Sequence, residues 1–157
     1  MTSSRSSSLI SLRLKDYFKD YSAYHKTAGN KLTHYFGIPF VITSLLGLLG
    51  GLPVGLDGLT GSLYFRVDAG TILIVVALLR YFYLDWKISI PFSFIITGLY
   101  FLGRALPISL CWGLFISGWI LQGMGHAVFE KNSPTFFKNL NHLLMGPLWI
   151  FVRCMGY

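Results

Sequence analysis

Long apolar runs separated by short polar segments make up most of the chain after residue 35. Four of these runs predict membrane-crossing helices, because about 20 mostly apolar residues in a helix span the hydrocarbon core of a bilayer. The runs cover residues 36–56, 69–84, 88–103 and 106–125. The second and third are short for a span, and the second carries Arg80 near one end, where a long side chain can extend toward the head groups.

The N-terminal part has a more polar pattern. Residues 1–8 are rich in serine, and we expect them to be disordered. Over residues 9–30, apolar and aromatic side chains recur at helical spacing between charged ones, which predicts a surface helix in the head-group region. The pair Gly29-Asn30 readily supplies a left-handed residue, so we expect this helix to end there.

A second interfacial helix is predicted after the fourth apolar run. Ser133 followed by Pro134 is an N-cap with proline at the first helical position. The predicted helix covers residues 134–145 and stops at Gly146-Pro147. The ten residues that follow are too few to span a bilayer, and we expect them to lie at its surface.

Composition supports a membrane protein with one all-α domain over residues 1–157. Hydrophobic residues make up 54% of the chain and charged residues 12%, whereas soluble domains carry about 25% charged residues. The net charge of +7 would suggest nucleic acid in a soluble protein. Here the basic residues flank apolar runs, so we interpret them as orientation signals that contact membrane lipids, and we expect no nucleic-acid partner.

The distribution of basic residues predicts which side of the membrane each loop occupies. With four spans, eleven of the thirteen lie on one side: Arg5, Arg13, Lys15, Lys19, Lys26, Lys31, Arg80, Lys87, Lys131, Lys138 and Arg153. Only Arg66 and Arg104 lie on the other side. This asymmetry predicts a multi-pass protein with both termini in the cytoplasm. The membrane would be that of the endoplasmic reticulum in a eukaryote or the inner membrane in a bacterium.

All four histidines lie just outside the apolar runs, at His25, His34, His126 and His142. An even number of crossings between the first pair and the second places all four imidazoles on the cytoplasmic side. Imidazole is the commonest protein ligand for transition metals, and three or four of them with one carboxylate suit a mononuclear Fe(II), Zn(II) or Mn(II) site. Glu130 follows His126 by four residues and shares its helix face, so it is the candidate carboxylate.

Several features have a second interpretation. A helix break near Gly29-Asn30 would let His25 and His34 face one site, whereas an unbroken helix would place them on opposite faces. Glu130 is equally expected to pair with Lys131 or to cap a backbone, and His142 to be an ordinary interfacial residue. The motif HExxH is absent, which argues against a zinc protease, and the two cysteines form no CxxC pair.

Two motifs carry a family resemblance, and they read Tyr24-His25-x4-Asn30-x3-His34-x2-Gly37-x-Pro39 and Gly118-Trp119-Ile120-x-Gln122-x2-Gly125-His126-x-Val128-Phe129-Glu130-Lys131-x2-Pro134. Together they resemble the small membrane family of the yeast 2-hydroxy fatty acid dioxygenase. The resemblance implies an Fe(II)-dependent enzyme that needs no 2-oxoglutarate. It implies cleavage of the C1–C2 bond of a long-chain 2-hydroxy fatty acid with O2, giving CO2 and a fatty acid one carbon shorter, in the α-oxidation that breaks down sphingoid bases.

The same resemblance assigns residues. It implies that His25, His34 and His126 are iron ligands, while His142 departs from the glutamine of fungal and plant members and is a candidate fourth ligand. Glu130 matches the motif, and we count it with Lys26 and Lys131 as a candidate catalytic group. Either lysine would offset the charge of the substrate carboxylate.

Two other functions are consistent with parts of the pattern. A non-catalytic lipid-binding or scaffold protein would use the histidines only for interfacial hydrogen bonds, and it would bind no metal. A small transporter is disfavoured, because no ionisable residue lies near the middle of an apolar run.

Overall fold

The computed structural model describes residues 10–54, 67–132 and 141–156, and within them the chain is all-helical. The elements are α2 (Leu12–Ala23), α3 (Ala28–Gly50), α5 (Ala69–Leu84), α6 (Trp86–Ala105), α7 (Ile108–Met124), the π-helical turn η1 (Gly125–Glu130) and α8 (Asn141–Cys154). The predicted all-α class is confirmed. The expectations for residues 1–8, for the last residues of the run 36–56 and for the helix start at Pro134 fall outside the described residues.

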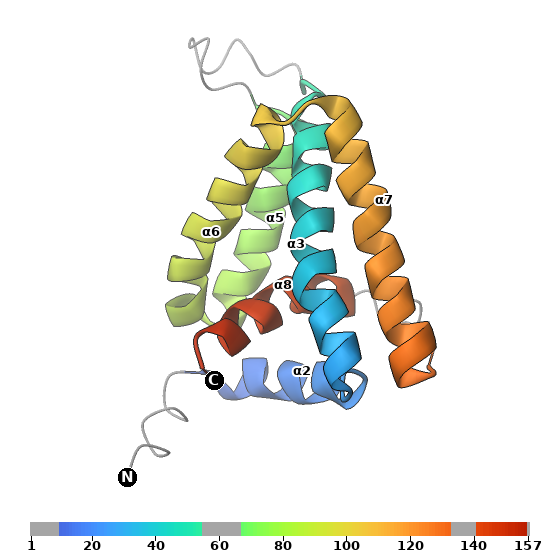
Figure 1. Ribbon diagram of the computed structural model, residues 1–157. Helices are drawn as coiled ribbons and strands as arrows, with labels where there is room; N and C mark the ends of the chain where they lie inside the picture. Colours follow the sequence, from blue (N-terminus) through green and yellow to red (C-terminus); the bar gives the residue numbers. More distant parts are fainter. Residues whose placement is uncertain (1–9, 55–66, 133–140, 157) are drawn as a thin grey trace.

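Four helices run side by side, and two lie across one end of them. Figure 1 shows α3 beside α5, α6 and α7, with α2 and α8 crossing the lower end of this bundle. α3 is the central element, because it packs against each of the other three long helices as well as against η1 and α8. α2 and α8 also pack on each other. The arrangement places both ends of the described chain at the same end of the bundle.

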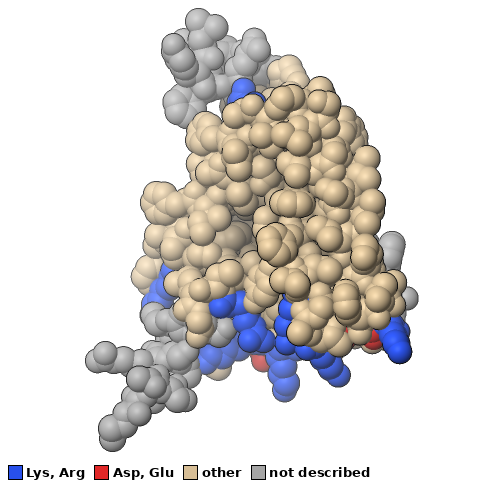
Figure 2. Space-filling view, viewed as in Figure 1, with Lys and Arg blue, Asp and Glu red and all other residues tan. Residues whose placement is uncertain are grey.

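Three helices are long and apolar enough to cross a membrane: Ala28–Gly50, Trp86–Ala105 and the continuous helix Ile108–Glu130. α5 is equally apolar, but its 16 residues make it shorter. The apolar run predicted at 69–84 coincides with α5, and the other three runs correspond to α3, α6 and α7 with shifted ends. Figure 2 shows a broad surface without charged side chains, with lysine and arginine gathered along the end where α2 lies.

Polar side chains fix where the helices begin. Ser11, Thr27, Asp68 and Asp85 each accept a hydrogen bond from a backbone N–H in the first turn of α2, α3, α5 and α6. The cap at Thr27 corrects one prediction: the break lies at residues 24–27, before Gly29-Asn30, and these two residues belong to the first turn of α3. A side-chain cap determines this break, and no left-handed glycine is involved.

A second correction concerns the C-terminal helix, which continues through Gly146-Pro147. α8 runs to Cys154 with Pro147 inside it. Gly146 packs tightly, since a Cβ there would lie 2.8 Å from Cδ1 of Ile38 and 3.0 Å from the hydroxyl of Tyr21. The residues that follow, including Trp149, are buried in the hydrophobic core. Tertiary packing therefore overrides the local tendency of glycine and proline to end a helix.

Glycine allows α3 and α6 to approach closely. A Cβ on Gly103 would lie 2.2 Å from the backbone oxygen of Thr43, and a Cβ on Gly47 would lie 2.4 Å from the backbone oxygen of Gly103. Glycines at both positions therefore let the two backbones meet without side chains between them.

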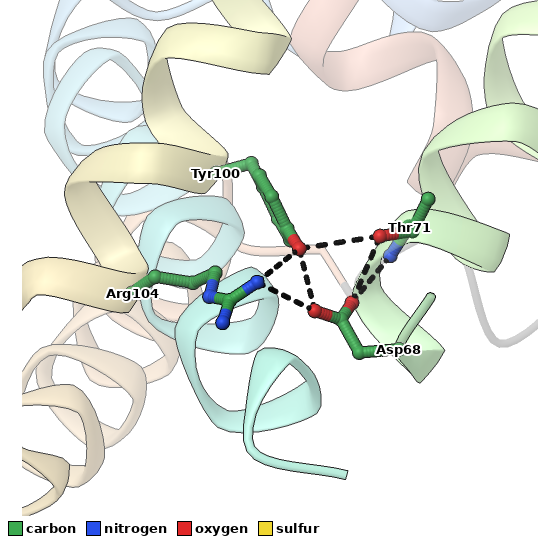
Figure 3. Close-up of polar contacts among 4 residues, drawn as sticks. All are labelled: Asp68, Thr71, Tyr100 and Arg104. Atoms are coloured by element: carbon green, nitrogen blue, oxygen red, sulfur yellow. Dashed lines mark hydrogen bonds and ion pairs between the residues drawn. The ribbon is translucent and has the colours of Figure 1, made fainter. Parts of the chain in front are cut away.

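A buried polar cluster joins α5 to α6 at the end of the bundle away from α2 and α8. Asp68, only 1% exposed, accepts hydrogen bonds from the backbone N–H and hydroxyl of Thr71, from the hydroxyl of Tyr100 and from Nη1 of Arg104 (Figure 3). Tyr100 also accepts a hydrogen bond from Arg104 at 2.9 Å. Every oxygen of this carboxylate is satisfied inside the cluster, which makes it a structural clamp between the two helices.

Candidate metal centre

His25 and His34 approach each other across the break between α2 and α3. His25 lies in the turn after α2, and His34 lies on the second turn of α3. Their Nε2 atoms are 3.3 Å apart. The sequence-based expectation that a break brings these two imidazoles to one site is confirmed.

A backbone carbonyl fixes the orientation of each ring. Nδ1 of His25 lies 2.8 Å from the oxygen of Tyr21, and Nδ1 of His34 lies 2.9 Å from the oxygen of Asn30. A carbonyl oxygen only accepts hydrogen bonds, so in a neutral ring Nδ1 carries the proton and Nε2 keeps its lone pair. The two Nε2 atoms therefore point lone pairs at each other. That contact is repulsive unless a positive species lies between them.

Because the two imidazoles are buried, a metal ion is favoured over a proton as the positive species between their Nε2 atoms. His25 is 2% exposed, and burial lowers its pKa to about 4, so its ring is neutral at physiological pH. A metal ion binds both lone pairs without protonating either ring. Carbonyl groups that hold the opposite nitrogen of a ligating histidine are also the usual support of metal sites. The residues present fit a bound metal ion.

His126, on the π-helical turn η1, supplies the third imidazole. It is 4% exposed, and its ring centroid lies 4.9 Å from those of both His25 and His34. One ring nitrogen from each of the three histidines lies within 4.8 Å of the others. Nδ1 of His126 is buried without a hydrogen-bond partner, which is uncommon and which a bound ligand would relieve. Single π turns inside α-helices are frequent at functional sites.

Two helices extend beyond their apolar runs and include a histidine. His34 and His126 lie just outside the runs 36–56 and 106–125, as predicted, but inside helices that are long enough to cross a membrane, near the ends of these helices. The reason is that the cap at Thr27 starts α3 before the apolar run, and that α7 continues through η1 as far as Glu130. All three imidazoles still meet at the end of the bundle where α2 and α8 lie.

Glu130 joins η1 to the start of α3. Its Oε1 accepts hydrogen bonds from the backbone N–H groups of Lys26 and Thr27 and from the Thr27 hydroxyl. Among the described residues, the group that could hold an ion consists of the three histidines and does not include this carboxylate. Of the roles that the sequence left open, capping a backbone is the one that these contacts match.

His142 lies close to the three histidines but outside their group. Its Nε2 is 2.7 Å from Oδ2 of Asp20, and its ring contacts the rings of Tyr21 and Tyr24. The lysines flanking the site, Lys26 and Lys131, are exposed, and Lys131 has a left-handed backbone with φ of 55° where η1 ends. No described contact places either ammonium group beside the imidazoles.

Two supporting residues escaped the sequence analysis. The ring of Tyr21 stacks on that of His25, with centroids 4.0 Å apart and planes at 8°. The spacing of four residues between them was the signal in the sequence for this contact. Gly125 is the second, because a Cβ there would lie 2.4 Å from Oδ1 of Asn30 and 3.3 Å from Cε1 of His34. Only glycine lets η1 come this close to α3.

The imidazoles line one end of a cavity of about 490 Å³. His25, His34, His126 and His142 all border it, together with Tyr21. The rest of the wall is largely apolar and comes from α3, α5, α6, α7 and α8. A candidate metal centre therefore opens onto a hydrocarbon-lined space within the bundle.

The chain is similar in sequence to known proteins. A family model described as "2-hydroxy-palmitic acid dioxygenase Mpo1-like" matches residues 11–156. The curated 2-hydroxy-palmitic acid dioxygenase MPO1 of Saccharomyces cerevisiae is 49% identical over 39 residues, which are 24% of this chain and 22% of that protein. The aligned part is thus about a fifth of the length of the curated relative. No solved structure gives a significant match.

Proposed function

The chain belongs to the Mpo1-like family, and from this premise we propose that it is a membrane dioxygenase of long-chain 2-hydroxy fatty acids. The proposed reaction uses O2 to cleave the C1–C2 bond, giving CO2, water and a fatty acid one carbon shorter. The observation that supports it best is the pair of opposed imidazole lone pairs beside a third buried imidazole, at the end of an apolar cavity.

We propose Fe(II) as the metal, held by His25, His34 and His126 without 2-oxoglutarate. When bound, iron supplies the one-electron and O2 chemistry that amino-acid side chains lack. The carbonyl groups of Tyr21 and Asn30 keep the two Nε2 atoms free of protons for this purpose. The stacked ring of Tyr21 holds His25 in place and covers it from water.

The cavity supports a lipid substrate. Its polar wall lies at the imidazoles and its remaining wall is largely apolar, which suits a molecule with one polar end and one hydrocarbon tail. A carboxylate at the imidazole end would also lie near the basic end of the molecule seen in Figure 2. The acyl tail can stay among apolar helices while its head group reaches the site.

We propose four membrane spans, with α5 as the fourth and both termini in the cytoplasm. At a rise of about 1.5 Å per residue, α5 is roughly 24 Å long, somewhat less than the ~30 Å hydrocarbon core. Arg80 near its end can reach the head groups, and it donates a hydrogen bond to the hydroxyl of Tyr17 on α2. In this topology α2 and α8 lie at the cytoplasmic interface, which also carries most of the basic residues.

Cysteine labelling in sealed vesicles tests the topology. Cys154 is exposed on α8 and Cys111 is buried, so a membrane-impermeant maleimide should react with Cys154 alone, and only from the cytoplasmic side. A cysteine placed at Val54, which is 40% exposed at the other end of the bundle, should react only from the opposite side. Reaction of both positions from one side would contradict the four-span arrangement.

The proposed activity can be assayed directly. The full chain, purified in detergent and supplied with Fe(II), should convert 2-hydroxypalmitate to pentadecanoate in air, and mass spectrometry detects both acids. His126→Ala should lose bound iron and product together, because it removes one of three ligands. Protein that holds one iron per chain but forms no product from 2-hydroxy acids would overturn the enzymatic proposal. Protein that binds neither iron nor zinc would favour the non-catalytic lipid-binding alternative.

A further inference from the structure

The cavity has a polar end and an apolar end that are far apart along the bundle. Tyr21, His25 and His126 line the polar end. The apolar wall at the opposite end includes Leu46 of α3, Leu73 of α5 and Phe115 of α7. The polar atoms that could bind a head group are therefore confined to one end.

The depth of the cavity follows from the helices that line it. On α3, His34 and Leu46 both border it and are twelve residues apart, or about 18 Å along the helix. On α7 and η1, Phe115 and His126 are eleven residues apart, or about 17 Å. One leaflet of a bilayer contributes half of the ~30 Å hydrocarbon core, roughly 15 Å. The cavity is thus slightly deeper than the hydrocarbon layer that one acyl chain of an ordinary membrane lipid crosses.

We propose that the depth of this cavity determines which acyl chain length of the substrate binds most tightly. In this proposal, which rests on the proposed function, the head group lies at the three histidines and the terminal methyl group lies at Leu46, Leu73 and Phe115. Chains shorter than the cavity leave its far end unfilled, and longer chains do not fit. Each methylene that moves from water into the apolar part of the cavity contributes about a fourfold gain in affinity, until the chain reaches the far end of the cavity.

Ala77 offers a way to shorten the cavity. It lines the wall on α5, one turn of helix from Leu73 and one turn from Tyr81, which also lines it. A phenylalanine at this position would project into the middle of the space. The neighbouring Val76 does not line the cavity and is 59% exposed, so Val76→Phe adds the same ring on the outer face of the same turn. It is the matched control.

Leu73 offers the opposite change. Leu73→Ala removes side-chain volume at the far end and should let the cavity accept longer chains. Leu79 is 67% exposed on the same helix and does not line the cavity, so Leu79→Ala controls for the general loss of a leucine from α5. The lengthening variant keeps the proposal testable if Ala77→Phe does not fold.

The experiment measures affinity across a series of chain lengths. The Fe(II)-loaded full chain is kept without oxygen, so bound acid is not consumed, and 2-hydroxy acids from decanoate to docosanoate compete with radiolabelled 2-hydroxypalmitate. Affinity in the unaltered protein, referred to the free monomeric acid in water, should rise about fourfold per methylene up to the length that fills the cavity and fall beyond it. The length of highest affinity should become shorter in Ala77→Phe, longer in Leu73→Ala, and stay unchanged in Val76→Phe and Leu79→Ala.

The outcomes separate this inference from the proposed function. If the folded cavity variants keep the length profile of the unaltered protein, or if the control variants shift it equally, the inference is wrong even when 2-hydroxypalmitate is still oxidised. If the profile shifts as expected while no chain gives a product in air, the inference stands and the proposed reaction fails. A 2-hydroxy acid with a photoreactive diazirine on its terminal carbon should label the segment around Leu46 or Phe115, and labelling confined to exposed residues such as Val76 would contradict the inference.

Discussion

Glu130→Gln tests whether this carboxylate positions the site or belongs to its chemistry. The carboxylate accepts hydrogen bonds from two backbone N–H groups and one hydroxyl at the start of α3. Hydrogen bonds to a charged group contribute about 1.5–3 kcal/mol, and those between neutral groups about 0.5–1.5 kcal/mol. The charge also interacts favourably with the positive end of the helix, by about 0.3–1 kcal/mol. Because Glu130 is partly exposed, we expect a loss near the lower end, about 1 kcal/mol for glutamine and about 2 kcal/mol for alanine.

Thermal unfolding and metal analysis of the same samples provide the assay. For a chain of this size, a loss of about 1 kcal/mol lowers Tm by roughly 2–4 °C. Glutamine keeps an oxygen that can accept the N–H groups, so Glu130→Gln should retain iron and turnover at temperatures well below its Tm. Glu130→Ala should lower Tm further and weaken iron binding, because His126 lies on the same turn and loses its anchor to α3.

Loss of iron from Glu130→Gln at an unchanged Tm would refute this reasoning. The result would mean that the carboxylate charge acts on the metal or the substrate, as the sequence analysis had allowed, and that its contacts with the start of α3 are incidental. Partial rescue of Glu130→Ala by a higher iron concentration is expected if the role is positional, because added metal stabilises the folded state that binds it.

Four further predictions concern separate features. His142→Gln should keep its bound metal, whereas His126→Ala should lose it, and metal analysis after gel filtration measures both. Because the folded pKa of His25 is about 4 against 6.5 for an exposed histidine, the unfolded chain binds more protons between these values. The metal-free protein should therefore lose about 3 kcal/mol of stability as the pH falls from 6.5 to 4 and no more from this group below that, which unfolding at a series of pH values detects. Gly103→Ala should destabilise the fold by about 1–3 kcal/mol, since its Cβ would lie 2.2 Å from a backbone oxygen of α3, and a lower Tm measures this. Asp68→Asn should destabilise by about 2 kcal/mol without changing iron content, because it weakens a buried clamp at the other end of the bundle.

Apolar patterning predicted the helices well and their ends less well. The run at 69–84 coincides with α5 because polar residues bound it on both sides, and Asp68 caps it. The start of α3 was missed although its cap, Thr27, is local, because Gly29-Asn30 was interpreted as the end of the preceding helix; Glu130, which also accepts hydrogen bonds there, is more than a hundred residues away in the sequence. The continuation of α8 past Pro147 was missed because buried contacts with other helices stabilise it. Local signals locate the helices and cap their starts, whereas contacts with other helices carry α8 past its local stop signals.

The sequence likewise predicted some features of the histidine site and missed others. His25, His34 and His126 were predicted to converge from the number of apolar runs and from the motifs, and both are properties of the sequence. The stacking of Tyr21 on His25 was not predicted, because it depends on the exact course of the turn between α2 and α3. The cavity was not predicted either, since residues from all of the described helices line it, and their side chains must be placed before a space between them can be seen.

The two ends of the bundle differ in whether their buried polar groups have hydrogen-bond partners. At one end, both carboxylate oxygens of Asp68 have partners in Thr71, Tyr100 and Arg104. At the other end lie the two buried side-chain atoms that lack a partner among the described residues, Nδ1 of His126 and Oδ1 of Asn30, beside two Nε2 atoms that face each other. Natural folds satisfy almost all buried polar groups, and this one does so where only stability is at stake. The concentration of unsatisfied groups at the histidines supports the proposed metal site, because a bound ligand would satisfy groups that otherwise cost stability.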